Sequence, residues 1–133
     1  MLKTYQGSCH CGAVRFEAEL DLTAPTLRCN CSFCRKARCW TAMVAPQAFR
    51  LLAGAQLLGE YQFGACREHH YFCQRCGVRP FGKGVSPQRG PFHAISVSCL
   101  DAVSEAELAG VPVTYVDGLH EQWTVAPRQT RHL

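Results

Sequence analysis

Seven of the ten cysteines of this chain stand in three short clusters, and their spacing constrains the fold more than any other feature. The clusters are a C-x-C at Cys9 and Cys11, a C-x-C-x-x-C at Cys29, Cys31 and Cys34, and a C-x-x-C at Cys73 and Cys76. Two cysteines one or three residues apart on a tight turn can place both sulfurs ~2.3 Å from one tetrahedral ion. The three clusters therefore predict soft-metal sites, with Zn²⁺ as the default metal.

A disulfide framework is the main alternative for a chain with so many cysteines. The N-terminus has no apolar stretch of the ~7–15 residues that a secretory signal peptide needs, and no uncharged run reaches the ~18 residues of a membrane span. Cysteines one residue apart bridge poorly, and the spacings match none of the common iron–sulfur runs. We therefore expect a cytoplasmic protein with reduced thiols and no membrane partner.

Length and charge limit the remaining classes of protein. A chain of 133 residues is typical of one domain, here residues 1–133, and is long enough to bury a core. Charged residues make up only 18%, which argues against disorder and against a coiled coil. A net charge of +4 tolerates an anionic small molecule but falls short of a dedicated nucleic-acid binder.

The pattern of apolar residues predicts a mostly β fold of short strands. Apolar side chains at every second position over residues 14–20 are typical of a half-buried strand. Further strands are expected over residues 27–30, 40–45, 56–63, 66–72, 92–100 and 113–116. One short helix is expected after Ser104, because Ser104 and Glu107 can form a capping box and Gly110 and Pro112 would end the helix.

The seven clustered cysteines cannot fill two closed four-sulfur sites, so they divide into four and three. The closed structural site would take Cys9, Cys11, Cys73 and Cys76, and the three-ligand site would take Cys29, Cys31 and Cys34. Structural zinc sites are closed, whereas catalytic ones keep a position open for water or substrate. The alternative is that Cys39, Cys66 or a histidine completes the second site.

The three-cysteine cluster also indicates the chemistry that it suits. Three thiolates on Zn²⁺ leave a net charge near −1, so the metal is a poor Lewis acid for water and favours an incoming thiol, which loses its proton there. Arg35, Lys36 and Arg38 directly follow the cluster. They would offset the negative charge or hold the carboxylates of a small anionic thiol, and a solvated basic turn is the alternative.

The order CHCG, CNCSFCRK, FCQRCG resembles the glutathione-dependent formaldehyde-activating enzyme family, which includes centromere protein V. The resemblance covers roughly residues 7–82, and residues 115–123 are similar to the short bacterial members. It implies a β-tent fold of short antiparallel strands with two zinc ions, the structural one held by Cys9, Cys11, Cys73 and Cys76 and the catalytic one by Cys29, Cys31 and Cys34. It also implies a carbon–sulfur lyase, similar to S-(hydroxymethyl)glutathione synthase, that acts on a glutathione-like thiol and a formaldehyde-like aldehyde.

The other chemistry-bearing residues have plainer interpretations. Cys39, Cys66 and Cys99 stand in apolar runs and are expected to be buried small hydrophobes. His10 lies between two ligands and is expected to face solvent or a neighbouring polar group, while one of His69 and His70 is expected to face the interior. Glu68 and Asp101 are expected on the surface or in turns.

Two competing functions remain beside the enzyme. A zinc-ribbon-like module that binds nucleic acid or protein would explain C-x-x-C turns near arginines, although a ribbon needs only four ligands. A thiol redox protein would use Cys73 and Cys76. The composition disfavours nucleic acid as a partner, and neither the true substrate nor the oligomeric state follows from the sequence.

Overall fold

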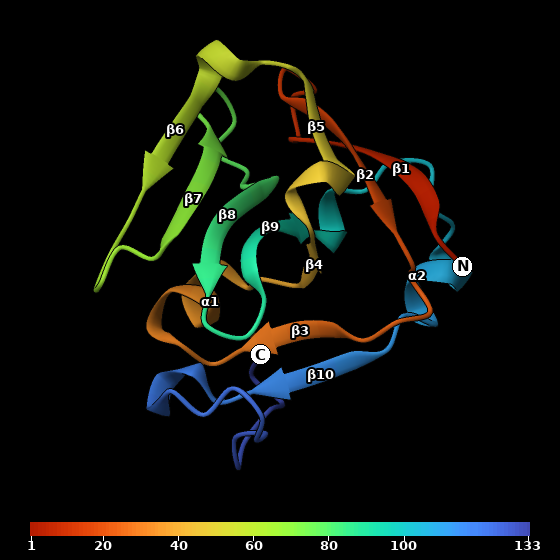
Figure 1. The fold of residues 1–133 in the computed structure, drawn as a ribbon. Helices are drawn as coiled ribbons and strands as arrows, with labels where there is room; N and C mark the ends of the chain where they lie inside the picture. The colour runs from red at the N-terminus through yellow and green to blue at the C-terminus, as the bar shows by residue number, and fades with distance from the viewer.

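The computed structural model describes residues 1–133 and contains ten strands, two α-helices and four single 3-10 turns (Figure 1). The strands are β1 Lys3–Ser8, β2 Arg15–Leu20, β3 Thr26–Cys29, β4 Thr41–Val44, β5 Phe49–Ala53, β6 Leu58–Tyr61, β7 Glu68–Cys73, β8 Phe81–Ser86, β9 Gly90–Ser96 and β10 Val113–Val116. The helices are α1 Ser32–Ala37 and α2 Glu105–Ala109, and the 3-10 turns are η1 Pro46–Ala48, η2 Ala55–Leu57, η3 Val97–Cys99 and η4 Gly118–His120. The expected mostly β fold class is confirmed.

The strands form two sheets. The smaller sheet has the order β1-β2-β5, and the larger one has the order β10-β3-β4-β9-β8-β7-β6. All pairs are antiparallel except β10 with β3, which run parallel along one end of the molecule in Figure 1. This parallel pair departs from the expected antiparallel arrangement, and it brings the segment after β10 to the cysteine cluster that follows β3.

The core lies between the two sheets. Phe16 of β2 is fully buried, and its ring stacks on Phe49 of β5 at 5.8 Å and meets Phe81 of β8 edge-on at 6.1 Å. Ile95 and Val97 are also fully buried. Burying side chains of this size stabilises the fold by roughly 1.5–3 kcal/mol each, so the two sheets hold the cysteine-bearing loops in place.

The helix expected after Ser104 is present as α2. Ser104 Oγ accepts a hydrogen bond from the Glu107 amide at 3.1 Å, as an N-cap does. Glu107 does not return the second half of the capping box. Its Oε1 instead accepts a 2.7 Å hydrogen bond from the Tyr5 hydroxyl, which ties α2 to β1 and raises the pKa of Tyr5 to about 12.

Several elements differ from the sequence-based expectation. A second helix, α1, begins inside the Cys29–Cys34 cluster and continues to Ala37, where only a turn was expected. β1, β5 and β8 were not predicted. The glycines of β8 give this segment little strand character in the sequence. A Cβ at Gly82 would lie 2.7 Å from the backbone carbonyl oxygen of His69, so packing requires a residue of low β propensity there. The strand expected over 92–100 ends at Ser96 and continues as a 3-10 turn.

Neither α-helix has the length or the apolar character that a helical membrane span requires.

Candidate metal centres

The first cysteine set comes from two loops that are distant in sequence. Cys9 and Cys11 follow β1, Cys73 ends β7, and Cys76 lies in the turn after it. Their four sulfurs lie within 4.8 Å of one another. The Sγ–Sγ separations are 3.6 Å for Cys9 and Cys11 and 3.7 Å for Cys11 and Cys73. A tetrahedral zinc with ~2.3 Å bonds sets its sulfurs ~3.8 Å apart, so this four-cysteine set fits zinc.

Glycine turns shape both halves of the four-cysteine set. Gly12 and Gly77 have φ values of 79° and 80°, the left-handed conformation that favours glycine. Their amides donate to the Cys9 and Cys73 carbonyls at 3.1 and 2.7 Å. Cys9 and Cys73 are buried, Cys76 is half-buried and Cys11 is exposed, so the set is closed by four ligands but reaches the surface at Cys11.

The second set is local. Cys29 ends β3, Cys31 is the N-cap of α1, and Cys34 lies in its first turn. The three sulfurs lie within 4.8 Å of one another, and no fourth cysteine, histidine or carboxylate ligand atom joins them at that spacing. The Cys31 amide donates to Cys29 Sγ and the Cys34 amide donates to Cys31 Sγ, both at 3.3 Å.

The pKa values of the three thiols shift in different directions. Hydrogen bonds from Cys29 and then Cys34 lower the pKa of Cys31, and backbone amides add to this effect. The pKa of Cys29 is raised to about 11, first by its hydrogen bond with Cys31. The pKa of Cys34 is raised by Cys29 and Cys31 and then by Cys39. Cys31 is therefore the first of the three to become a thiolate, the form that binds metal.

A partly buried polar cluster from β7 and the turn before β8 borders the three-cysteine set. His70 is 3% exposed, and its ring stacks on Phe33 of α1 at 3.8 Å. Arg79 Nε donates to His70 Nδ1 at 3.2 Å, and Arg79 Nη2 lies 3.5 Å from Glu68 Oε1. Burial, followed by the charge of Arg79, lowers the pKa of His70 to about 4. His70 is thus a neutral acceptor that orients a cation beside the thiols.

The segment after β10 covers the other side of the set. Asn30, between two ligand cysteines, donates from Nδ2 to Asp117 Oδ1 at 2.8 Å and accepts from the Leu119 amide at 2.9 Å. The Asn30 hydrogen bond lowers the pKa of Asp117, whose carboxylate also meets His120 Nδ1 at 2.9 Å. No pattern in the sequence singles out Asn30, Asp117 or His120, because the contacts between Asn30 and Asp117 join residues 87 positions apart.

The comparisons with known proteins agree with this architecture. The family model described as "Glutathione-dependent formaldehyde-activating enzyme" matches residues 4–117. The chain belongs to this formaldehyde-activating enzyme family. The resemblance stated from the cysteine order is therefore confirmed.

Two relatives of this family member support the assignment. A protein of Halomonas elongata named "Putative glutathione-dependent formaldehyde-activating enzyme" is 58% identical over 31 residues, which are 23% of this chain and 20% of that protein. The match thus spans about a fifth of that relative's length. A crystal structure of a Rhodobacter sphaeroides protein is 35% identical, with a TM-score of 0.70 over 82% of this chain and 99% of the other.

In this family member, a cleft of about 650 Å³ lies beside Cys9 of the four-cysteine set, and Cys29, Cys31 and Cys34 do not line it. Its lining also includes His10, Gly77, Arg38, Cys39 and Arg79. Arg38 follows α1 and Arg79 belongs to the partly buried polar cluster, so two cations face this space. Arg35 and Lys36 are exposed on α1 and do not line the cleft.

The isolated cysteines only partly follow the expectation that they are buried. Cys99 is buried, but Cys39 is half-buried and lines the cleft. Cys66 is exposed in the turn between β6 and β7, with a φ of 55°, so the prediction that it is buried is wrong. Neither Cys39 nor Cys66 completes the three-cysteine set.

The remaining polar residues are placed as follows. His10 is exposed at the cleft, and Asp101 is an exposed residue that accepts a 2.8 Å hydrogen bond from Ser8. His70 is the histidine that faces the interior, while His69 meets Glu60 at the surface. Glu68 was expected at the surface, but it is partly buried against Arg79, and burial raises its pKa.

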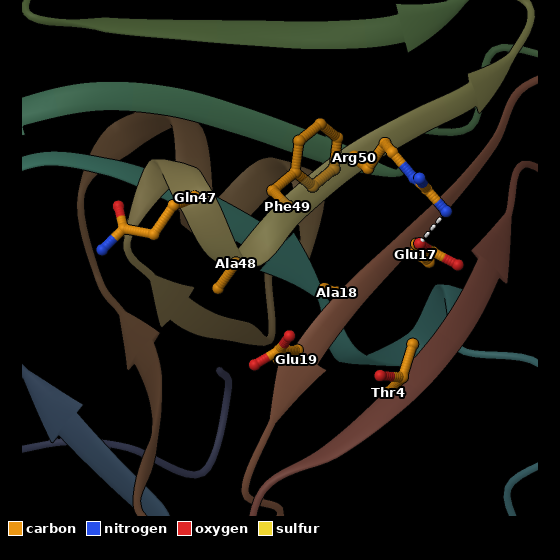
Figure 2. Close-up of a pocket in the computed structure, with 8 residues that line it drawn as sticks. All are labelled: Thr4, Glu17, Ala18, Glu19, Gln47, Ala48, Phe49 and Arg50. Atoms are coloured by element: carbon orange, nitrogen blue, oxygen red, sulfur yellow. Dashed lines mark ion pairs between the residues drawn. The ribbon is translucent and has the colours of Figure 1, made fainter.

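A second, shallower groove of about 250 Å³ lies on the three-stranded sheet and η1 (Figure 2). An ion pair between Arg50 and Glu17 crosses one end of it. No cysteine or histidine lines this groove, so it offers no chemistry of the kind found at the cysteine sets.

Proposed function

We propose that this chain is a zinc-dependent enzyme that adds a small thiol, glutathione or a relative, to formaldehyde or a similar aldehyde, and that it also runs the reverse reaction. The observation that carries the proposal is the division of seven cysteines into a closed set of four and a set of three without a fourth side-chain ligand. Closed sets are typical of structural zinc, and three-ligand sets leave a position for a substrate. The family's description, which names glutathione and formaldehyde, suggests the thiol and the aldehyde as substrates.

Two zinc ions per chain fit these donors, one held by Cys9, Cys11, Cys73 and Cys76 and one held by Cys29, Cys31 and Cys34. Zinc at the second set supplies a soft position that acidifies a thiol. In the overall addition, the thiol sulfur bonds to the carbonyl carbon, the C=O double bond becomes single, and the proton ends on oxygen. No further co-reactant is required, and the reverse reaction is the carbon–sulfur cleavage of a lyase.

The chain's own residues bind and orient in this scheme. The amide hydrogen bonds to Cys29 and Cys31 stabilise the thiolate forms that hold metal. Arg38 and Arg79 face the cleft, whose 650 Å³ is within the range that holds small ligands. Arg79 uses Nε on His70 and keeps further donors for a carboxylate of the thiol. All ten cysteines are free, as a reducing cytoplasm would keep them.

A binding titration tests the proposal. Calorimetry with glutathione, with S-methylglutathione and with a short oligonucleotide should show binding of glutathione alone, because only its free thiol can reach the metal. Equal binding of both glutathione forms would mean that the sulfur never reaches the metal. Binding of the oligonucleotide alone, weakening steeply with salt, would replace the enzyme with a nucleic-acid module.

A rate measurement completes this test, because thiols and aldehydes also combine unaided. Nuclear magnetic resonance exchange between formaldehyde and its glutathione adduct should be faster with the wild-type protein than with Cys31→Ser at equal concentration. Equal exchange rates would reduce the protein to a carrier of thiol adducts.

A further inference from the structure

The indole of Trp123 lies directly beside one sulfur of the three-cysteine set. A Cβ placed on Gly118 would lie 2.4 Å from Cys29 Sγ and 2.8 Å from the Trp123 ring. The sulfur and the ring therefore flank the same face of Gly118. The close approach of the backbone to Cys29 explains why a glycine stands here.

The loop that carries Trp123 is closed upon itself and anchored to the cysteine cluster. The Asp117 amide meets the carbonyls of Gln122 and Val125 at 3.2 and 3.0 Å, and the Gln122 amide returns a 2.9 Å hydrogen bond to the Asp117 carbonyl. Asn30 holds the start of this loop through Asp117. The indole is thus fixed relative to Cys29 by hydrogen bonds on both sides of it.

Packing in the core does not account for the position of this ring. Trp123 is 53% exposed and is absent from the core cluster. A large, exposed aromatic side chain on an anchored loop is typical of a residue that contacts a ligand. Such a side chain buries a large apolar area on binding and loses little conformational entropy.

We propose that Trp123 is a substrate-contacting residue that selects thiols by the carbon group attached to their sulfur. This inference rests on the proposed function. In a tetrahedral site the fourth ligand lies ~4 Å from each of the other three sulfurs, and apolar groups are in contact at about 4 Å. The indole is the aromatic surface next to Cys29, so a thiol that enters the fourth position from the side of Gly118 would pack its carbon atoms against the indole. The site should prefer thiols with an apolar or aromatic carbon group over small polar ones.

Two thiol probes on the cobalt-loaded protein test this inference. Benzyl mercaptan can reach the indole with its ring, whereas 2-mercaptoethanol cannot make that contact, and both report binding through the visible thiolate–cobalt absorption. Trp123→Ala should weaken benzyl mercaptan about tenfold and 2-mercaptoethanol less than about threefold. Trp123→Phe should keep benzyl mercaptan within about threefold of wild type, because a ring remains. Leu119→Ala is the matched control, since Leu119 is 58% exposed on the same loop, and it should leave both affinities unchanged.

The outcomes separate this inference from the proposed function. An equal loss for both thiols in Trp123→Ala would mean that the indole only supports the metal set, and no loss for either would mean that it touches no substrate. Either result overturns the inference alone. A wild-type cobalt spectrum that responds to neither thiol overturns the proposed function and the inference with it.

Discussion

The two cysteine sets use the same donor atom but are built in opposite ways. In the four-cysteine set, Cys11 and Cys73 meet across 62 residues of sequence, so the set links the loop after β1 to the end of β7. The three-cysteine set closes within residues 29–34. A metal in the first set cross-links the tertiary structure, whereas a metal in the second orders only one loop.

Burial follows the same division only in part. The four-cysteine set has two buried ligands, Cys9 and Cys73, beside the half-buried Cys76 and the exposed Cys11, whereas the ligands of the three-cysteine set are all half-buried. The local set instead takes its surroundings from distant residues, since Asn30 and Asp117 meet across 87 residues. The comparison teaches that a long-range ligand set stabilises the fold, while a local one leaves its coordination accessible to a small molecule.

The largest difference between the two sets is expected when one ligand is removed from each. Cys73→Ser takes a fully buried ligand from the closed set, and we expect it to cost ~3 kcal/mol or more, because metal binding there contributes to folding free energy. Cys31→Ser should cost less than ~1 kcal/mol while abolishing metal-dependent thiol binding. Thermal melts of both variants provide the measurement. Severe destabilisation by both would show that the second set is structural too.

Metal counting sharpens the same comparison. Gently purified protein should bind two zinc ions, and a chelator should remove the ion of the three-cysteine set first, because three half-buried ligands hold a metal less tightly than four. Elemental analysis combined with a colorimetric zinc indicator follows the two losses. A single zinc that does not rise when zinc is added would contradict the two-site arrangement.

A further substitution tests Asn30, which links the three-cysteine set to the loop after β10. Asn30→Ala leaves the buried Asp117 carboxylate and the Leu119 amide without this partner, which should cost about 2 kcal/mol. Hydrogen exchange should rise over residues 117–125 more than elsewhere. Gln74→Ala is the matched control beside the four-cysteine set, because Gln74 donates its amide to the Leu58 carbonyl from an exposed position, and its effect should stay below ~0.5 kcal/mol. Uniform exchange across the chain would show that Asn30 does not anchor this loop.

The smallest expected effect is the pH dependence of stability that His70 causes beside the three-cysteine set. The pKa of His70 falls to about 4 in the folded chain, from an ordinary value of 6.5, because the ring is buried and Arg79 is near. The unfolded chain therefore binds the proton more readily, and the stability that His70 contributes falls as the pH drops from 6.5 towards 4. We expect wild type to lose on the order of 1 kcal/mol more than His70→Gln between pH 7 and pH 5.5. Parallel urea-denaturation results at the two pH values would contradict this assignment.

The sequence predicted the parts of the fold and the site that depend on residues close together in the chain. The spacing of the cysteines indicated two groups of sulfurs, and Ser104 marked the start of α2. Asn30 looked like a spacer between ligands, because its partner is Asp117 and no local pattern links them. Cys66 stands in an apolar run but at a turn with positive φ, so hydropathy alone misplaced it. β8 was missed because Gly82 and Gly84 have low β propensity, whereas the backbone carbonyls of His69 and Arg67 lie too close for any larger residue there.

The last residues of the chain are hydrogen-bonded to Arg38, four residues after Cys34, and this affects how the protein should be prepared. Arg38, directly after α1, donates from Nη1 to the His132 carbonyl at 3.1 Å. A polyhistidine tag fused after Leu133 would therefore bring extra imidazoles close to Cys29, Cys31 and Cys34, where they would compete for zinc or occupy its free position. Met1 is 84% exposed and precedes β1 of the other sheet. A cleavable tag at the N-terminus would keep the imidazoles of the tag away from the three-cysteine set.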